Sequence, residues 1–592
     1  MKRLMFLLLV AALPPALLAQ TPIIEYTLTA KNPLSHLYNV EMQIIGIRSS
    51  SVDVAMPAWS PGVYAIRDFA GNVQQFEAST RQDRPLKFEQ IDKQTWRIAK
   101  AAGDDLRVRY RVYSTALNDS MADITPAAVF MYVAGQTGMP VSVKYEGADG
   151  WRVYTALEKR GDRYAAPDYD TLAASPAFLG NFKVLEFRSG NTPYRVVFSN
   201  PRVQLTDLQV EADLSDLGDA AAEMFGSVPF KDYTFLVKVQ PVSGASSVGY
   251  PNSSRLTAGE NDFVNQASYG AFISAAARGL VKAWYYAAVR QKSMPPPDYS
   301  REAYSRNLWF TEGVSAYSAD LLLLRSGILN SSEYFAKAGS EMDALQHQPG
   351  RLMTSMEDAS WNTWTRSDNS ANVSVSYILK GKIVGLLLDA EIRVHTSGAK
   401  GFQDVLRHLT TQANGGRPGL VDSALETAIQ TSTSVDTREF FDSLVRGRSE
   451  IDYNRYLDKA GIHANVMKGP ASIFFGIDYE RIEANQARVR RAIPGSPAEA
   501  AKLDGGDILL AMDSERVTFD NLAGRIHSKP VGKPVALTVL RGERLLTLTI
   551  TPGLTQTETW SLGETEPSTP DQVRLRNAWR GVSAGAQESA PR

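Results

Sequence analysis

The pattern of apolar residues changes once along the 592-residue chain, and this change limits the folds that the chain can adopt. From about residue 22 to 185, short runs alternate between apolar and polar residues, as in 106–112. Successive side chains of a strand point to opposite faces, so this alternation predicts sheets with one buried face. From about 190 to 450 a few strands give way to helices. One such helix contains residues 320–325 and is closed by Gly327. We therefore predict an α+β multidomain protein that begins with a β-sandwich-like domain.

An export signal and the absence of cysteine define the conditions under which the chain folds. Residues 1–19 open with Met1-Lys2-Arg3, continue as an apolar run and end at Ala19, which is typical of a secretory signal peptide. We therefore expect a periplasmic or secreted protein, with an uncleaved anchor as the alternative. No later run of roughly 18 apolar residues predicts a membrane span in the mature protein. Because the chain has no Cys, packing must stabilise the fold without disulfides.

Charge and histidine content narrow the function. A formal net charge of −1 gives no electrostatic reason to expect nucleic acid as a partner. The histidines are His36, His347, His395, His408, His463 and His527. No two of them have the i, i+4 spacing that places two imidazoles on one helix face to bind zinc. A histidine metal site would therefore need residues distant in sequence to converge.

Two segments between residues 278 and 313 carry a family resemblance. The first is Arg278-Gly279-Leu280-Val281-Lys282, followed by Trp284, and the second is Trp309-Phe310-Thr311-Glu312-Gly313. Together they resemble the glycyl aminopeptidase family of secreted or periplasmic zinc peptidases that end in a PDZ domain. In that family the first segment is H-E-x-x-H on a helix, and the second is W-x-x-E-G, whose Glu is the third zinc ligand. The resemblance implies a thermolysin-like, mixed and largely helical peptidase domain, and it aligns Glu312 with the third ligand.

The residues that would bind and activate zinc are replaced. Arg278 and Lys282 stand at the two histidine positions, and Gly279 stands at the general-base glutamate. Protonated Arg and Lys have no lone pair for a metal ion, and glycine has no side chain to take a proton from metal-bound water. We therefore predict that zinc is lost and that no cofactor is bound. Without zinc, the Glu312 carboxylate needs another positive partner, and we expect a salt bridge to Arg278 or Lys282.

Two further catalytic positions of the family also differ. The stretch 247–253 aligns with the strand that holds the substrate's amino group, and its acidic position is Gly249. The stretch 376–381 resembles S-Y-Y-x-K-G, and the position of the tyrosine that stabilises the oxyanion is Ile378. Tyr377 lies one residue earlier, but on a helix it points about 100° away. Substrate recognition and oxyanion stabilisation are therefore predicted to be lost together with the metal.

Residues 465–555 resemble a PDZ domain over its full length. The segment Phe474-Phe475-Gly476-Ile477 opens it, and Gly505-Gly506-Asp507-Ile508-Leu509 follows. In a PDZ domain the backbone N–H groups of the opening loop hold a peptide carboxylate, and the next strand accepts the peptide as an added strand. The resemblance implies that residues 474–477 bind a peptide or the C-terminus of a protein. The alternative is a domain that packs on its neighbour without a ligand.

The predicted order combines these segments. It is a signal peptide (1–19), an N-terminal β domain (20–188), a peptidase-like domain (189–455), a PDZ domain (465–555) and a partly disordered tail (556–592). Within the tail, residues 570–579 are expected to form a short helix that docks on the body of the protein. The sequence favours an exported pseudopeptidase that binds peptides. The alternatives are an active metallo-aminopeptidase with non-standard ligands and a scaffold that has also lost peptide binding.

Overall fold

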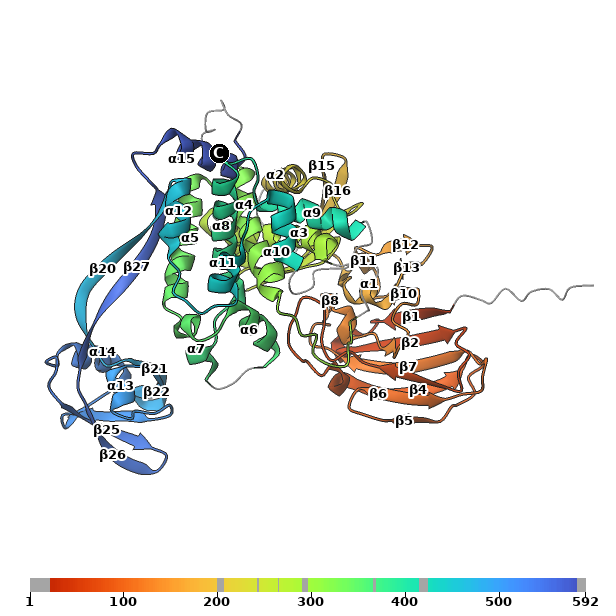
Figure 1. The fold of residues 1–592 in the computed structure, drawn as a ribbon. Coiled ribbons are helices and arrows are strands. Elements are labelled where there is room, and N and C mark those ends of the chain that lie inside the picture. The colour runs from red at the N-terminus through yellow and green to blue at the C-terminus, as the bar shows by residue number, and fades with distance from the viewer. Residues whose placement is uncertain are drawn as a thin grey trace, which may run out of the picture. The chain divides into compact units, whose positions relative to one another are not determined.

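Figure 1 shows a computed structural model of the chain, which describes residues 22–199, 207–241, 244–264, 266–289, 297–365, 369–414 and 424–582. The chain forms two compact units. The first is Met1–Phe182 with Pro296–Glu302, and the second is Lys183–Pro295 with Ala303–Arg592. The predicted signal peptide, residues 1–19, lies outside the described residues. Among the helices that the structure describes, none is long and apolar enough to cross a membrane.

The first unit consists mainly of β-strands. Its largest sheet has seven strands in the order β12-β13-β10-β1-β2-β7-β4. Their bounds are β1 (Ile23–Thr29), β2 (Leu37–Ile45), β4 (Val73–Thr80), β7 (Leu106–Tyr113), β10 (Val141–Glu146), β12 (Glu158–Arg160) and β13 (Arg163–Ala166). Along β7, Leu106, Val108, Tyr110 and Val112 are buried, whereas the residues between them are not. The predicted alternation of 106–112 is confirmed, because one face of the sheet covers the core.

Two smaller sheets and a returning segment complete the first unit. One sheet has the order β5-β6-β3-β9 and the other the order β11-β14-β8. The bounds are β3 (Ser51–Ala55), β5 (Phe88–Gln90), β6 (Thr95–Ala99), β8 (Met121–Ile124), β9 (Tyr132–Val133), β11 (Arg152–Thr155) and β14 (Ala177–Gly180). The segment Pro296–Glu302 joins this unit through Tyr299, whose hydroxyl donates to the Asp170 carboxylate at 2.8 Å and whose ring stacks on Trp59. This is the β-rich N-terminal domain that the sequence predicts.

The second unit begins with a five-stranded sheet in the order β15-β16-β17-β19-β18. The bounds are β15 (Lys183–Ser189), β16 (Thr192–Phe198), β17 (Tyr233–Gln240), β18 (Ser246–Gly249) and β19 (Ser253–Gly259). Because β15 pairs with β16, residues 183–188 belong to this sheet, whereas the sequence-based boundary at 188 placed them in the N-terminal domain. Nothing in the strand pattern itself marks a change of sheet, so the sequence did not locate this boundary.

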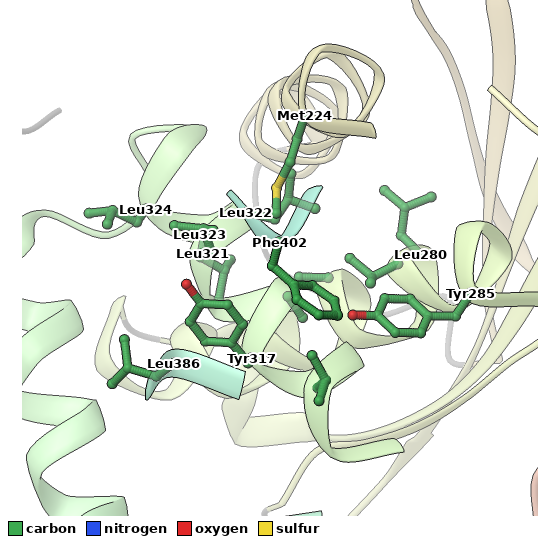
Figure 2. Packing of buried hydrophobic residues seen from close by; sticks show 14 of the residues in the cluster. Met224, Leu280, Tyr285, Tyr317, Leu321, Leu322, Leu323, Leu324, Leu386 and Phe402 are labelled. Carbon is green, nitrogen blue, oxygen red and sulfur yellow. The ribbon is translucent and has the colours of Figure 1, made fainter. Parts of the chain in front are cut away.

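Helices pack on this sheet and around one another. The bounds are α2 (Asp207–Phe225), α3 (Gln266–Val289), α4 (Ser315–Arg325), α5 (Ser331–Gln346), α6 (Met356–Trp361), α7 (Ser370–Val373), α8 (Tyr377–His395), α9 (Phe402–Asn414), α10 (Ala424–Thr433), α11 (Arg438–Phe440) and α12 (Tyr453–Leu457). A short π-helical segment, η5 (Trp309–Val314), precedes α4. Figure 2 shows Tyr285 of α3, Leu322 of α4 and Leu386 of α8 in one cluster with Phe402. The mixed, largely helical character predicted for this region is confirmed.

Residues 477–550 form a small domain with its own core. Its sheet has the order β21-β22-β23-β25-β26, with β24 paired to β23. The bounds are β21 (Ile477–Ile482), β22 (Gln486–Ala492), β23 (Ile508–Met512), β24 (Glu515–Arg516), β25 (Val535–Arg541), β26 (Arg544–Ile550), α13 (Pro497–Ala500) and α14 (Phe519–His527). Phe475, Val489, Leu509 and Val539 are among its buried residues. In the part of the chain that the structure describes, β21 is an edge strand of this sheet.

A two-stranded ribbon leads into and out of the small domain. Strands β20 (Ile462–Phe474) and β27 (Gly553–Glu564) pair antiparallel, and Figure 1 shows them side by side. The ribbon lies against α5, where a Cβ added to Gly339 would come 2.8 Å from the Leu562 nitrogen. The Trp560 N–H also donates to the Asp343 carboxylate at 2.9 Å. These contacts fix the ribbon to the helical part of the second unit.

The chain then forms helix α15 (Pro570–Arg580), which buries Trp579. The Trp579 indole N–H donates to the Tyr317 hydroxyl at 2.9 Å, and its ring stacks on Phe335. Residues 556–564 are therefore ordered in β27 rather than disordered, and the short docking helix predicted at 570–579 is confirmed as α15. The polar composition of 556–564 gave no sign of this strand, because β27 buries only one of its residues, Leu562. Residues 583–592 lie outside the described part.

Candidate functional site

Helix α3 carries the segment 278–282 in its middle. Leu280 and Trp284 pack into the core, and the Trp284 indole N–H donates to the Ser227 carbonyl at 3.0 Å. Arg278 is exposed, and its side chain has no hydrogen-bond or salt-bridge partner among the described residues. Lys282, one helical turn later, is largely buried, with 12% of its side chain exposed. The two cations that the sequence resemblance aligns with histidines therefore lie in different environments.

Lys282 forms a salt bridge with Glu312. Its Nζ lies 2.5 Å from Glu312 Oε1 and also donates to the Thr311 carbonyl at 2.6 Å. The π-helical segment η5 presents both acceptors to α3. The predicted pairing of Glu312 with one of the two cations is thus confirmed, and Lys282 is the partner rather than Arg278. An ammonium between these oxygens neutralises the carboxylate where the family resemblance expects a metal ion.

Gly279 leaves no room for the side chain of a general base. A Cβ on Gly279 would lie 2.6 Å from the Cβ and 2.9 Å from the Oγ of Ser254 on β19. The Gly279 carbonyl is also fixed, because the buried Tyr233 hydroxyl donates to it at 2.9 Å. Helix α3 therefore rests directly on the sheet at the position where the family has its glutamate.

Gly249, at the end of β18, faces the same turn of α3. A Cβ on Gly249 would come within 2.5 Å of both the Gly279 carbonyl oxygen and the Lys282 Cβ. An acidic side chain that could bind a substrate amine does not fit there with this backbone. Gly249 and Gly279 thus allow the helix and the sheet to touch, a packing role that the sequence did not reveal.

The oxyanion position lies at the beginning of α8. The Ser376 side chain caps this helix by accepting from the Leu379 N–H at 3.1 Å. Ile378 is 41% exposed, whereas Tyr377 packs against the core. Because both residues are helical, the predicted rotation between them is confirmed, and Tyr377 does not replace the missing tyrosine at 378.

Lys380 is a buried titratable residue near this end of α8. It is 1% exposed, and its Nζ donates to the Arg351 carbonyl at 3.2 Å. Burial lowers the pKa of Lys380 to about 8, with Glu450 acting in the opposite direction and Arg351 lowering it further. In the sequence, Lys380 is only the lysine of the stretch 376–381 that resembles S-Y-Y-x-K-G, because burial cannot be read from a motif.

The residues around α3 do not fit the zinc ion that the family resemblance implies. Among the described residues, no group of three or more His, Cys, Asp and Glu side chains is arranged to hold a metal ion. Of the residues that the resemblance aligns with zinc ligands, only Glu312 has a side chain that could bind the ion, and the Lys282 ammonium lies against its carboxylate. A cation in that position repels a dication.

The segment 474–477 lies between the ribbon and β21. Gly476 has φ +80°, a left-handed conformation that favours glycine, and a Cβ there would overlap Ser496. Within the described residues, the backbone N–H groups of Phe475 and Gly476 have no acceptor, although their carbonyls accept from Ala498 and Ile493 at 2.8 Å. The segment therefore presents two free consecutive donors next to an open strand edge, an arrangement that can bind an anion.

Two family models match the sequence. The peptidase M61 N-terminal domain matches residues 25–181, and the M61 glycyl aminopeptidase domain matches residues 271–384. Residues 25–181 and 271–384 are therefore each similar to a domain of the M61 peptidase family. The second match spans the stretch from Arg278 to Ile378, which includes Gly279, Lys282 and Glu312. No functionally curated protein matches the sequence.

Similar solved structures concern the fold. The chain is similar to an aminopeptidase N family protein from Idiomarina loihiensis, with 23% identity, a TM-score of 0.83 and coverage of 94% of this chain and 100% of that chain. It also matches an M1 zinc metallopeptidase from Deinococcus radiodurans at 13% identity and a TM-score of 0.44, covering 74% of this chain and 95% of that one. Yeast LTA4 hydrolase in complex with bestatin matches at 13% identity and a TM-score of 0.45, covering 74% of this chain and 67% of that one. The first match supports the fold, and the other two are too distant to support an argument.

Proposed function

We propose that this protein is an exported, catalytically inactive relative of the glycyl aminopeptidases, which binds peptides or protein C-termini through a PDZ domain. One observation carries the proposed inactivity, namely the 2.5 Å contact between Lys282 Nζ and Glu312 Oε1. The ammonium supplies positive charge to the carboxylate without offering a lone pair or activating water. It stabilises η5 in the absence of a metal, while the chemistry of the metal is lost.

The close packing of α3 on the sheet supports the same conclusion. Gly279 and Gly249 cannot be exchanged for acids on this backbone, because each Cβ would meet a neighbouring atom at 2.6 Å or less. Neither a general base nor an amine anchor can therefore stand at these positions. Ile378 offers no hydrogen-bond donor for an oxyanion.

The alternative is an active aminopeptidase with non-standard ligands, and metal analysis distinguishes the two. The purified full-length protein is incubated with zinc, desalted and assayed for bound metal and for turnover of glycyl and alanyl arylamides, beside an active glycyl aminopeptidase. We expect no stoichiometric zinc and no turnover above the buffer rate. Stoichiometric zinc together with hydrolysis would establish the alternative.

Restoring the motif tests whether the loss extends beyond the ligands. The variant R278H/G279E/K282H has the family's H-E-x-x-H, but the Ser254 side chain stands where the new glutamate would begin. We expect no activity from this variant, nor from the variant that also carries Ser254→Gly, because Gly249 and Ile378 remain unchanged. Strong activity in either would show that the other replaced positions are dispensable.

The free donors at Phe475 and Gly476 support the proposed peptide binding. A terminal carboxylate would accept from these N–H groups, and the peptide backbone would pair with the open edge of β21. Fluorescent peptide pools with free C-termini, compared with the same pools carrying C-terminal amides, test this on the full-length protein. We expect binding of the free acids only. Absence of binding to either pool would favour the alternative of a scaffold that has also lost peptide binding.

The proposed export rests on the pattern of residues 1–19 and is tested separately. The full chain and a version without 1–19 are expressed in a Gram-negative host, and periplasmic and cytoplasmic fractions are compared. We expect the full chain in the periplasm with its N-terminus shortened near Ala19. Retention of an intact N-terminus in the membrane fraction would indicate an uncleaved anchor.

A further inference from the structure

Strand β26 is the second edge of the small domain's sheet, opposite to β21. It pairs with β25 from Arg544 to Ile550 without a register shift. Along residues 545–550, all of which the structure describes, the sequence Leu-Leu-Thr-Leu-Thr-Ile has no charge and no proline. Natural edge strands usually carry a charge, a proline or a bulge that prevents pairing with a further strand. Strand β21 has a bulge and three charged residues, so β26 is the unprotected edge of the two.

The unpaired backbone groups of β26 lie at three alternate residues. Asp513 follows β23, which lies on the side of β25 away from β26. The Ala536 N–H donates to the Asp513 carboxylate at 2.9 Å, and the Ala536 carbonyl accepts from the Asp513 N–H at 2.8 Å. Ala536 and its neighbour Thr549 are therefore not hydrogen-bonded to each other. Because such pairs alternate along an antiparallel ladder, the N–H and C=O groups of residues 545, 547 and 549 point out of the edge.

These outward groups are free and exposed. Among the described residues, none of the backbone groups of 545, 547 and 549 has a hydrogen-bond partner. Leu545 is 65% exposed, and Thr547 and Thr549 are exposed as well. On the other face of the strand, Leu546 and Leu548 are only half-buried against the small domain's core. The edge therefore offers both a ladder of donors and acceptors and an incompletely covered apolar surface.

The strand is complementary to a second copy of itself. If two copies pair antiparallel about a two-fold axis beside Thr547, this residue lies opposite its own equivalent, and Leu545 lies opposite Thr549. In the same register, Leu546 lies opposite Leu548 and covers its exposed part. Arg544 lies opposite Ile550, so no two like charges face each other across the pairing.

We propose that two copies of this chain associate through β26, in the antiparallel register centred on Thr547. The sheet of one small domain then continues into that of the next. The inference does not depend on peptide binding, because β21 and residues 474–477 lie at the opposite edge of the sheet and remain free in both copies. A partner with two chain ends could therefore bind a dimer with higher avidity than a monomer.

Sedimentation velocity of the full-length protein measures the association. Pairing of a single strand buries a small area, so the dimer is expected to be weak and to appear between about 1 and 200 µM. The variants are Thr547→Lys and Thr547→Glu, because a charge at this position faces its own equivalent across the axis. We expect each variant alone to raise the Kd roughly tenfold at low salt, and an equimolar mixture of the two to restore the dimer.

Ala536→Lys is the matched control. Ala536 is exposed on the neighbouring strand, and in the proposed register it lies roughly 20 Å from its equivalent in the second copy. This separation exceeds the Debye length at physiological salt, so the control is expected to dimerise like the native protein.

Each outcome decides the proposal. Recovery of the dimer in the mixture of Thr547→Lys and Thr547→Glu supports it. A native protein that stays monomeric over the whole range overturns it, and so does a dimer that neither variant weakens. Weakening by both variants without recovery in the mixture overturns the proposed register.

A thiol cross-link gives a second measurement that does not depend on charge. Because the chain has no Cys, Thr547→Cys introduces a single thiol, and in the proposed register two such thiols lie close together. A short bis-maleimide is expected to link two copies of Thr547→Cys and not of Ala536→Cys. Equal linking of both variants, or of neither, would contradict pairing through β26.

Discussion

Gly279 of α3 packs directly against Ser254 of β19, so that a Cβ on the glycine would lie 2.6 Å from the serine Cβ. Real Cβ atoms essentially never come this close, so an added side chain must move either the helix or the strand. The Tyr233 hydroxyl, bound to the Gly279 carbonyl, opposes such a movement. The glycine at the general-base position is therefore required by the present packing of α3.

Gly279→Ala is expected to destabilise the protein although alanine favours helices. Overpacking costs about 1–3 kcal/mol, against roughly 1 kcal/mol gained in helix propensity. Gly270→Ala is the matched control, because it lies on the same helix and a Cβ there would meet nothing within 4 Å. We expect the control to stabilise the protein by up to about 1 kcal/mol in urea unfolding. If both variants change stability equally, the contact with Ser254 does not prevent a side chain at position 279.

Removing the charge of Lys282 is expected to lower the free energy of unfolding by roughly 3 kcal/mol, because the half-buried Glu312 carboxylate then loses the ammonium beside it. The variant is Lys282→Met, and the measurement is urea unfolding at neutral pH. Adding Glu312→Leu to Lys282→Met is expected to recover most of this loss. The exposed pair Lys93–Asp68, with 60% and 56% of the side chains exposed, is the control, and Lys93→Met should cost under about 1 kcal/mol. A double variant no more stable than Lys282→Met would argue against charge compensation.

Lys380 is expected to make stability depend on pH. Its pKa in the folded state is about 8, below that of an unfolded lysine, so the folded state loses this proton first as pH rises. The contribution of Lys380 to the free energy of unfolding is therefore lowest below pH 8, and it increases as the pH rises toward the pKa of an unfolded lysine. Between pH 8 and 9.5 the gain is roughly 1.5 kcal/mol. Urea unfolding of the native protein and of Lys380→Met across this range measures the difference, and parallel curves would contradict the assignment.

The C-terminal helix is expected to stabilise the helical part of the second unit. Trp579→Ala removes a buried ring beside Phe335 and a donor to the Tyr317 hydroxyl, which should cost about 3–5 kcal/mol. Val573, on the same helix, is 40% exposed, and Val573→Ala is the control with an expected loss under about 1 kcal/mol. Thermal unfolding followed by far-UV circular dichroism distinguishes them. Similar losses for both variants would mean that α15 contributes little.

The sequence predicted those features that depend on residue type and spacing. The pairing of Glu312 with Arg278 or Lys282 followed from a carboxylate that needs a positive partner, whereas the choice of Lys282 came only from the structure. The rotation between Tyr377 and Ile378 followed from helical geometry alone. The alternation in 106–112 predicted its strand because one face of that sheet is solvated.

Features that depend on packing between distant segments were not visible in the sequence. The fit of Gly249 and Gly279 against α3 and Ser254 depends on a helix and two strands meeting, and the motif showed only missing side chains. The low pKa of Lys380 depends on burial by residues far along the chain. The polar segment 556–564 seemed structureless by composition because its partner, β20, lies about 90 residues earlier.

The ribbon of β20 and β27 makes the small domain a separable cassette. Its last pair, Phe474 opposite Gly553, brings the two ends of residues 475–552 together at one point. Excising those residues and joining the ends with a short hairpin turn would leave the remaining β20 and β27 pairing and helix α15 uninterrupted. A domain inserted at such a point can be replaced or deleted during evolution while the rest of the protein keeps its fold.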